Sequence, residues 1–313
     1  MTKKLDISIV IPVYNSEKYL KRAAESVVSS LGKIDGEILL VENNSTDKSL
    51  DVIQELIKTY KGKISVLHYS TPGASPSRNL GMKKARGEYV WFIDADDTIT
   101  PDAIPKLLTK ARQEKADIVM FGAERIYENG HKDYLSPVDE SMKNYKSRFV
   151  RYGMGPWQIL IRRKWWQEYG FSFKEGIIHE DMELMSALIL YTDRYTSIDE
   201  PLYSYYQTSE SVLHKKKFNP HVFDIFPALE GLYQRFEKAG AEKAYHAELE
   251  WFFIWNLLID SAKDFSRFKE GRSGFTRSRE MLKKYFPNWR RNKFLRQKPL
   301  KLQIYVRMNY KKK

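Results

Sequence analysis

Short apolar segments alternate with amphipathic stretches in the first third of the chain. Four of these segments are rich in β-branched and aromatic residues and read as buried strands; they span residues 7–14, 37–41, 64–68 and 89–93. Between them, apolar residues recur at helical spacing, with Ser16 as a candidate cap for a helix that ends near Leu31. Strand and helix alternate, which predicts a mostly parallel sheet with helices on both faces.

The later pattern is less regular and predicts a second region. A helix over 101–113, a strand over 117–123 and a strand over 157–161 are expected, and the polar stretch 128–151 is interpreted as a hairpin with a mobile loop over an acceptor. From Pro220 onward the pattern is helical. We therefore expect an α/β domain over 1–214, with halves 1–102 and 103–214, and a helical extension over 215–313.

Composition adds limits to this picture. Of the 313 residues, 30% are charged and 42% are apolar, and cysteine is absent, so a disulfide framework and thiolate chemistry are excluded. The longest apolar run, 251–259, is far below the roughly 20 residues of a membrane-spanning helix. These features predict a soluble, cytoplasmic protein.

The net charge of +13 is concentrated in a tail. Residues 269–313 contain sixteen Lys or Arg against two Glu, a balance of +14, so the remainder sums to about −1. Apolar residues such as Phe294, Leu295, Leu300 and Ile304 are interleaved with these charges. One interpretation is peripheral docking on an anionic membrane surface; the other is a solvated helical surface whose apolar side chains pack on the catalytic domain. The C-terminal helices are also candidates for a contact between copies of the chain.

Polar clusters follow three of the predicted strands. Asn15 follows the first, residues 42–45 the second, and Asp94, Asp96 and Asp97 the fourth. Ligands bind at the carboxyl ends of strands in open α/β sheets, so these clusters are expected to face one crevice. Clustered carboxylates repel one another unless a cation lies between them, and their hard oxygens suit Mg²⁺ or Mn²⁺. A solvated turn is the structural alternative.

Four motifs carry a resemblance to a known family. They are Ser-Ile-Val-Ile-Pro-Val-Tyr-Asn, Glu-Ile-Leu-Leu-Val-Glu-Asn-Asn-Ser-Thr-Asp, Ser-Arg-Asn-Leu-Gly and Gly-Glu-Tyr-Val-Trp-Phe-Ile-Asp-Ala-Asp-Asp, at 8–15, 37–47, 77–81 and 87–97. In this order they resemble the family 2 inverting glycosyltransferases of the GT-A fold. Residues 195–206 also resemble the members of this family that build bacterial polysaccharides. The resemblance extends over residues 7 to about 214.

The resemblance implies roles for residues around a nucleotide-sugar donor. Asp94 would lie on the ribose side, Asp96 would hold Mn²⁺ or Mg²⁺ on the diphosphate, and Arg78 would lie near the nucleotide.

Four further residues would surround the base. Pro12 and Tyr14 would line it, and Glu42 and Asn43 would bind base and ribose. The family usually has Asp where Asn43 stands. An amide can both accept from and donate to uracil, but it can also turn to suit other bases, so the implied donor is a UDP-sugar with the base left open.

A second chemical centre follows Gly176, in the segment Gly-Ile-Ile-His-Glu-Asp. It resembles the family pattern Gly-x-x-x-Glu-Asp, which implies that Asp181 is the catalytic base on the acceptor hydroxyl, with Glu180 supporting it or contacting the acceptor. The structural alternative is favourable charge at a helix N-terminus. His179 is another candidate base, although a lone His beside a strand end is more often structural.

These observations predict a metal-dependent inverting glycosyltransferase that moves a sugar from a nucleotide donor to a glycan or lipid-linked acceptor. A sugar-phosphate nucleotidyltransferase would need a Gly-rich, Lys-bearing loop after the first strand, and residues 14–17 offer neither. A basic nucleic-acid-binding module would leave the carboxylate clusters unexplained.

Overall fold

The computed structural model describes residues 5–71, 73–137, 145–207 and 218–312, which divide into two compact units. Both units are assembled from separate stretches of the chain. Within the described residues, the first unit comprises 5–71, 73–137, 154–176 and 192–207, and the second comprises 145–153, 177–191 and 218–312. Two segments that the sequence placed in the first domain are therefore grouped with the C-terminal helices.

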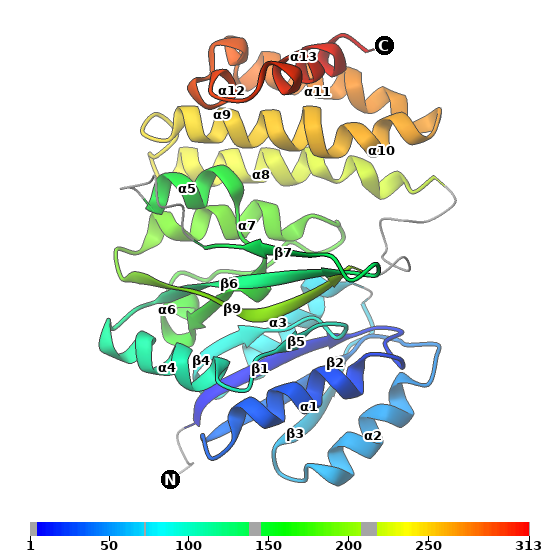
Figure 1. The fold of residues 1–313 in the computed structure, drawn as a ribbon, viewed down its shortest axis with the longest axis vertical. Coiled ribbons are helices and arrows are strands. Elements are labelled where there is room, and N and C mark those ends of the chain that lie inside the picture. Colours follow the sequence, from blue (N-terminus) through cyan, green and yellow to red (C-terminus); the bar gives the residue numbers. More distant parts are fainter. Residues whose placement is uncertain (1–4, 72, 138–144, 208–217, 313) are drawn as a thin grey trace. The chain divides into compact units, whose positions relative to one another are not determined.

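The first four strands pair in parallel, in the order β3-β2-β1-β4 (Figure 1). They are β1 (Leu5–Val13), β2 (Gly36–Glu42), β3 (Ile64–His68) and β4 (Gly87–Phe92). Four helices accompany them: α1 (Leu20–Leu31), α2 (Ser49–Thr59), α3 (Ala74–Lys84) and α4 (Ala103–Gln113). The α/β fold predicted from the alternating pattern is confirmed.

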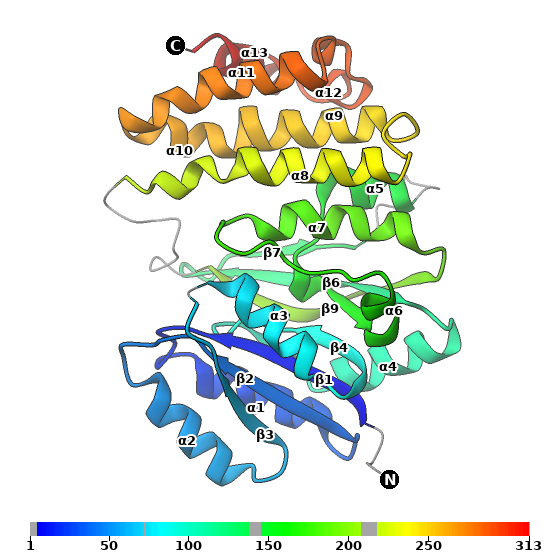
Figure 2. The ribbon, with the colours of Figure 1, turned by 180° about the vertical axis from the view of Figure 1, so that it is seen from behind.

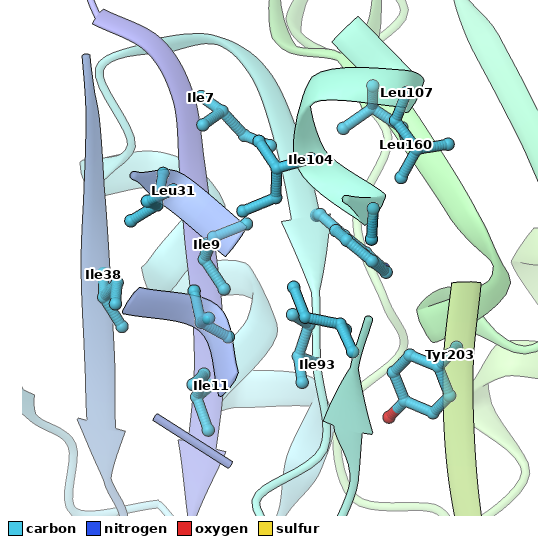
Figure 3. Packing of buried hydrophobic residues seen from close by; sticks show 14 of the residues in the cluster. Ile7, Ile9, Ile11, Leu31, Ile38, Ile93, Ile104, Leu107, Leu160 and Tyr203 are labelled. Carbon is cyan, nitrogen blue, oxygen red and sulfur yellow. The ribbon is translucent and has the colours of Figure 1, made fainter. Parts of the chain in front are cut away.

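Alternate residues of β1 pack on opposite faces of the sheet. Ile7, Ile9 and Ile11 belong to a fully buried cluster with Leu31 of α1 and Ile104 of α4 (Figure 3). Val10 points the other way, toward α3, which the view from behind shows on that face (Figure 2). A parallel sheet buried on both sides explains why its strands are almost continuously apolar.

The rest of the sheet is mixed, because alternation of strand and helix stops after α4. β6 (Ile118–Tyr127) turns directly into β7 (Lys132–Leu135), which confirms the predicted hairpin; residues 138–144 of the predicted loop lie outside the described residues. The prediction of a loop is wrong at its C-terminal end, where a helix, α5 (Tyr145–Tyr152), forms instead. β8 (Ile159–Arg162) is antiparallel to both β4 and β6. β9 (Tyr195–Gln207) is parallel to β6 and antiparallel to the short β5 (Thr98–Ile99).

The second unit consists of helices. They are α5 (Tyr145–Tyr152), α7 (Glu180–Leu188), α8 (Ile225–Lys238), α9 (His246–Trp255), α10 (Ser261–Arg267), α11 (Ser273–Tyr285), α12 (Lys293–Arg296) and α13 (Leu300–Lys311). A π-helical segment, Asn256–Asp260, joins α9 to α10. α7 packs on α8, α5 on α9, and α13 on the π-helical segment and α11. Among the described residues, no helix is long and apolar enough to cross a membrane.

The apolar residues of the basic tail have two different environments. Phe294 and Leu295 are buried, whereas Leu300 and Ile304 are 70% and 48% exposed. Phe294 and Leu295 belong to α12, which packs on α9 within the second unit, and α13 retains an outward apolar side.

Candidate functional site

The carboxyl ends of β1, β2 and β4 lie level with one another. The register pairs Pro12 with Val41 and Val13 with Glu42, and the N–H of Ile93 donates to the carbonyl of Val10 (3.0 Å). The segments that follow these three strands therefore leave the sheet at one edge. The structure brings the predicted donor residues of β1, β2 and β4 to this edge.

The loops after β1 and β2 are fastened to each other. Asn15, in left-handed conformation (φ 48°), accepts a hydrogen bond from the backbone N–H of Thr46 through its Oδ1 (2.7 Å). The N–H of Glu17 donates to Asp47 (3.0 Å), and the N–H of Lys48 donates back to Glu17 (2.8 Å). The ring of Tyr14 is left 60% exposed, as a flat surface open to a ligand.

Ser16 does not cap a helix. Its hydroxyl donates to the carbonyl of Tyr14 (3.1 Å), and α1 begins only at Leu20. The predicted cap is wrong because the turn that fastens the two loops takes up these residues.

Glu42 is a buried carboxylate with local donors. Its Oε1 accepts from the N–H of Ser45 (2.6 Å), and its Oε2 lies 3.3 Å from Nδ1 of His68. Burial raises the pKa of Glu42, but the hydrogen bonds from Ser45 and His68 outweigh burial and hold that pKa below its usual value. The side chain is therefore an anion at the edge.

Asn43 fastens the loop that leads to α3. Its Nδ2 donates to the carbonyls of Tyr69 (3.0 Å) and Thr71 (2.6 Å), and its Oδ1 accepts from the N–H of Gly73 (2.8 Å). A carboxylate has no N–H to give these carbonyls, which accounts for an amide at this position. The second lone pair of Oδ1 can still accept a hydrogen bond from a nucleotide base.

The Ser-Arg-Asn-Leu-Gly motif makes three different contacts. Arg78 donates through Nη2 to Oδ1 of Asp94 (3.0 Å). Asn79 pairs with the backbone of Phe173, donating to its carbonyl and accepting from its N–H, both at 2.9 Å. A Cβ on Gly81 would meet Val10 Cγ1 at 2.2 Å, so only glycine lets α3 approach β1 this closely. Sequence reasoning assigned Arg78 but missed the role of Asn79.

The turn after β4 holds three carboxyl groups, and the pKa values of two of them are raised. Asp97 is fully buried; its Oδ2 accepts from the phenol of Tyr203 (2.6 Å) and its Oδ1 from the N–H of Tyr206 (2.8 Å). Burial and the neighbouring Asp96 and Asp94 carboxylates raise the pKa of Asp97 to about 9, so it is protonated at neutral pH. Asp97 is a support of the turn that the sequence did not assign.

The pKa of Asp96, in the same turn, is also raised, but less than that of Asp97. Burial, and then the Asp94 carboxylate, raise the pKa of Asp96 to about 6. Arg22 of α1 stacks on the ring of Tyr206 (3.9 Å) and donates to the backbone carbonyl of Asp96 (2.7 Å), which fixes the turn without neutralising the carboxylate directly.

The donor set of this turn suits a hard cation. Asp94 and Asp96 offer carboxylate oxygens that repel each other, and within the described residues no group of three or more Asp, Glu or His side chains is arranged to enclose a metal. Mg²⁺ ordinarily takes one or two carboxylates and completes its shell with phosphate and water oxygens. The residues therefore fit a cation that arrives with a phosphorylated ligand.

Glu180 and Asp181 form the first turn of α7, in the second unit. The N–H of Met182 lies 2.9 Å from Oδ1 of Asp181. His179 before them is left-handed (φ 70°), a conformation that costs free energy in a non-glycine residue. Burial lowers the pKa of His179 despite the nearby carboxylates of Glu180 and Asp260, so this histidine is neutral.

Asp224 and His221 hold the segment that leads to α7. The N–H of Ile178 donates to Oδ2 of Asp224 (3.0 Å), and Nδ1 of His221 lies 2.8 Å from the same oxygen. These residues lie beyond the stretch covered by the motifs, so no sequence signal pointed to them.

Comparisons with known proteins identify the family of this chain. Residues 8–170 match the family model described as Glycosyl transferase family 2. A Bacillus subtilis (strain 168) relative, uncharacterized glycosyltransferase EpsJ, is 28% identical over 254 residues, 76% of this chain and 72% of that protein. The poly(ribitol-phosphate) beta-glucosyltransferase of Bacillus spizizenii is 26% identical over 85% of this chain, but the match spans only 41% of that longer protein.

Solved structures show the same fold. A crystal structure of S. aureus TarS 1-349 in complex with UDP has a TM-score of 0.75 at 20% identity, over 98% of this chain and 88% of that chain. The complex of the same protein with UDP-GlcNAc has a TM-score of 0.76 at 19% identity, with the same coverage. The resemblance and the GT-A architecture predicted from the motifs are confirmed. Since its model matches more than half of the chain, this protein belongs to glycosyl transferase family 2 and is a glycosyltransferase.

Proposed function

We propose that the chain transfers a sugar from a UDP-sugar to a hydroxyl of a glycan or lipid-linked glycan acceptor, with inversion at the anomeric carbon and with Mg²⁺ or Mn²⁺. The observation that carries the proposal is the edge of the sheet at which Arg78 pairs with Asp94 in the turn that also carries Asp96, and at which the exposed Tyr14 follows β1. The TarS complexes with UDP and UDP-GlcNAc and a mannosyltransferase complex with GDP-Man and Mn²⁺ (TM-score 0.57, 15% identity) support a nucleotide-sugar donor.

In the proposed donor complex each group binds a chemically matched part of the nucleotide. The base stacks on Tyr14 along Pro12, with Glu42 and the carbonyl oxygen of Asn43 as acceptors for its N–H and for ribose hydroxyls. Asp94, oriented by Arg78, accepts from the ribose side. Uracil N3–H is a donor that a carboxylate or amide oxygen satisfies, which favours uridine.

Asp96 is the proposed protein ligand of the cation. When bound, Mg²⁺ or Mn²⁺ would neutralise charge that grows on the departing diphosphate. The protein contributes a turn fixed by Arg22 and Asp97, so that the Asp96 carboxylate is held in place before a donor arrives. Burial, and then the Asp94 carboxylate, raise the pKa of Asp96 by more than Arg22 lowers it, so a bound cation would stabilise the Asp96 anion.

Asp181 is the proposed general base. It takes the proton of the acceptor hydroxyl as that oxygen forms a bond to the anomeric carbon, while the bond from that carbon to the diphosphate oxygen breaks and UDP leaves with the electron pair. Glu180 supports this carboxylate or contacts the acceptor. The poly(ribitol-phosphate) beta-glucosyltransferase relative supports a bacterial polysaccharide acceptor, and a lipid-linked acceptor would place the enzyme at the inner membrane face.

A panel of nucleotide sugars tests the donor assignment. Purified protein with Mn²⁺ is incubated with UDP-glucose, UDP-galactose, UDP-GlcNAc and GDP-mannose, and release of the nucleoside diphosphate is measured with and without a glycan acceptor. We expect release from a UDP-sugar that is suppressed by chelation. Turnover confined to GDP-mannose would overturn the uridine assignment, and full turnover in chelated buffer would overturn the metal.

A further inference from the structure

The last helix of the second unit, α13, packs on the π-helical segment and α11 through one side only. Val306 and Asn309 are buried; Nδ2 of Asn309 donates to the carbonyl of Leu258 (2.9 Å), and the ring of Tyr310 lies 5.0 Å from that of Trp289. In both ribbon views α13 lies at the edge of the helical stack beside α11 (Figures 1 and 2). Its orientation is therefore set by defined contacts.

The opposite side of α13 carries large apolar side chains in solvent. Leu300, Ile304 and Met308 are 70%, 48% and 60% exposed, and their spacing of four residues places them along one line of the helix. Exposed basic residues, Lys301, Arg307 and Lys311, share this side. We call these six residues the α13 face.

Charge limits what can cover the α13 face. From residue 281 to 313 the sequence contains twelve Lys or Arg and no Asp or Glu. A second copy of the same face would bring like charges together as it buried the leucine, isoleucine and methionine, so self-association by this side is disfavoured. A surface that covers the α13 face must therefore offer an apolar layer to its apolar side chains and negative charge to its basic ones.

We propose that the α13 face lies on an anionic lipid bilayer. Leu300, Ile304 and Met308 would enter the boundary between headgroups and acyl chains, while Lys301, Arg307 and Lys311 reach lipid phosphates, as in helices that lie in a membrane interface. The alternation of both residue types on one side distinguishes this face from a solvated basic surface, which needs no exposed leucine or methionine. The proposal does not depend on the donor or acceptor of the enzyme.

The test is flotation of the full chain with vesicles of phosphatidylglycerol and phosphatidylcholine, and with phosphatidylcholine alone. The wild-type protein is expected to float with the anionic vesicles and to be released by high salt in part. The triple variant Leu300→Ser, Ile304→Ser, Met308→Ser is expected to lose at least about tenfold in partitioning, because burial of large apolar side chains supplies the binding. Lys301→Glu, Arg307→Glu, Lys311→Glu should abolish the preference for anionic lipid.

Matched controls are Leu50→Ser and the pair Lys58→Glu, Lys61→Glu, which change an exposed leucine and exposed lysines of the first unit. Circular dichroism and thermal melting establish that each variant is folded. Retention of flotation by both triple variants, or equal loss in the controls, would overturn the proposal. So would binding of the wild-type protein to RNA together with failure to bind anionic vesicles.

Discussion

The phenol of Tyr203 forms hydrogen bonds to both ends of the turn that runs from Asp94 to Asp97. Its oxygen donates to Oδ2 of Asp97 at 2.6 Å and accepts from the backbone N–H of Asp94 at 3.2 Å. Tyr203 is fully buried on β9, and its hydrogen bond to Asp97 joins residues 106 positions apart. The geometry of the proposed cation ligand is therefore set from a strand distant in sequence.

Asp97 predicts a loss of stability with rising pH. Its pKa is raised to about 9 in the folded chain, while the unfolded chain has the usual value near 3.8, so between these values the folded state binds more protons. The free energy of unfolding of the cation-free protein should then fall as pH rises from about 7 to about 9, a range in which Asp96 has already lost its proton.

Urea denaturation across this range measures the slope. Asp97→Asn should flatten it, because an amide does not titrate, whereas Asp51→Asn, at an exposed position of α2, should keep it. Equal slopes in wild type and Asp97→Asn would contradict a protonated Asp97.

Asp96→Asn should separate cation binding from folding. The substitution removes a carboxylate with a raised pKa, so the cation-free variant should be at least as stable as wild type at pH 8. Wild-type protein should gain thermal stability from Mn²⁺ with UDP, and the variant should not. Asp102→Asn, an exposed carboxylate nearby in sequence, is the control. A full Mn²⁺-dependent shift in Asp96→Asn would place the metal ligand elsewhere.

Asn43→Asp should weaken the edge even though it restores the residue common in the family. A carboxylate would face the carbonyls of Tyr69 and Thr71, which lose their donors, and the expected cost is about 1–3 kcal/mol of unfolding free energy. Chemical denaturation and UDP titration measure the effect; Asn129→Asp controls for added charge, because Asn129 is exposed and its Oδ1 accepts from the N–H of His131 (3.0 Å), which a carboxylate can also do. An unchanged denaturation midpoint would show that the loop does not depend on this amide.

Asp181→Asn should retain donor binding and lose transfer by on the order of 10²–10⁴, the usual contribution of a general base. Calorimetric titration with UDP and initial rates with acceptor give the two quantities. The control is Glu237→Gln, an exposed position of α8. If affinity for UDP falls in parallel with rate, Asp181 belongs to donor binding and another group is the base.

Asp224 should act as a positioning residue for that base. Asp224→Ala removes the acceptor of the Ile178 N–H and should lower kcat by about tenfold through misplacement, with KM for the donor little changed. Asp224→Asn keeps a carbonyl oxygen and should rescue most of kcat. A purely structural role would instead lower thermal stability in both variants with no split between kcat and KM.

The sequence predicted what is local and missed what is paired over distance. Buried strands such as 7–14 can be predicted from their apolar composition. The polar residues at their ends lie close together because parallel strands end at one edge of the sheet. Tyr203 and Asp224 carry no such signal, since their importance comes from partners in distant segments. Asn43 is expected at the base, but both of its N–H groups donate to the backbone carbonyls of Tyr69 and Thr71, contacts that no sequence pattern indicates.

The discontinuous make-up of the second unit has a consequence for how the polypeptide can be divided. α5 and α7 come from the middle of the chain, yet the helices that cover them, α9 and α8, follow residue 218. A fragment that ended at residue 214 would keep every recognisable motif and strip both helices of their apolar partners. During synthesis from the N-terminus, the α7 turn with Glu180 and Asp181 would lack its packing partner α8 until part of the last hundred residues had been made. The segment that carries the proposed base is therefore complete in sequence long before it is complete in structure.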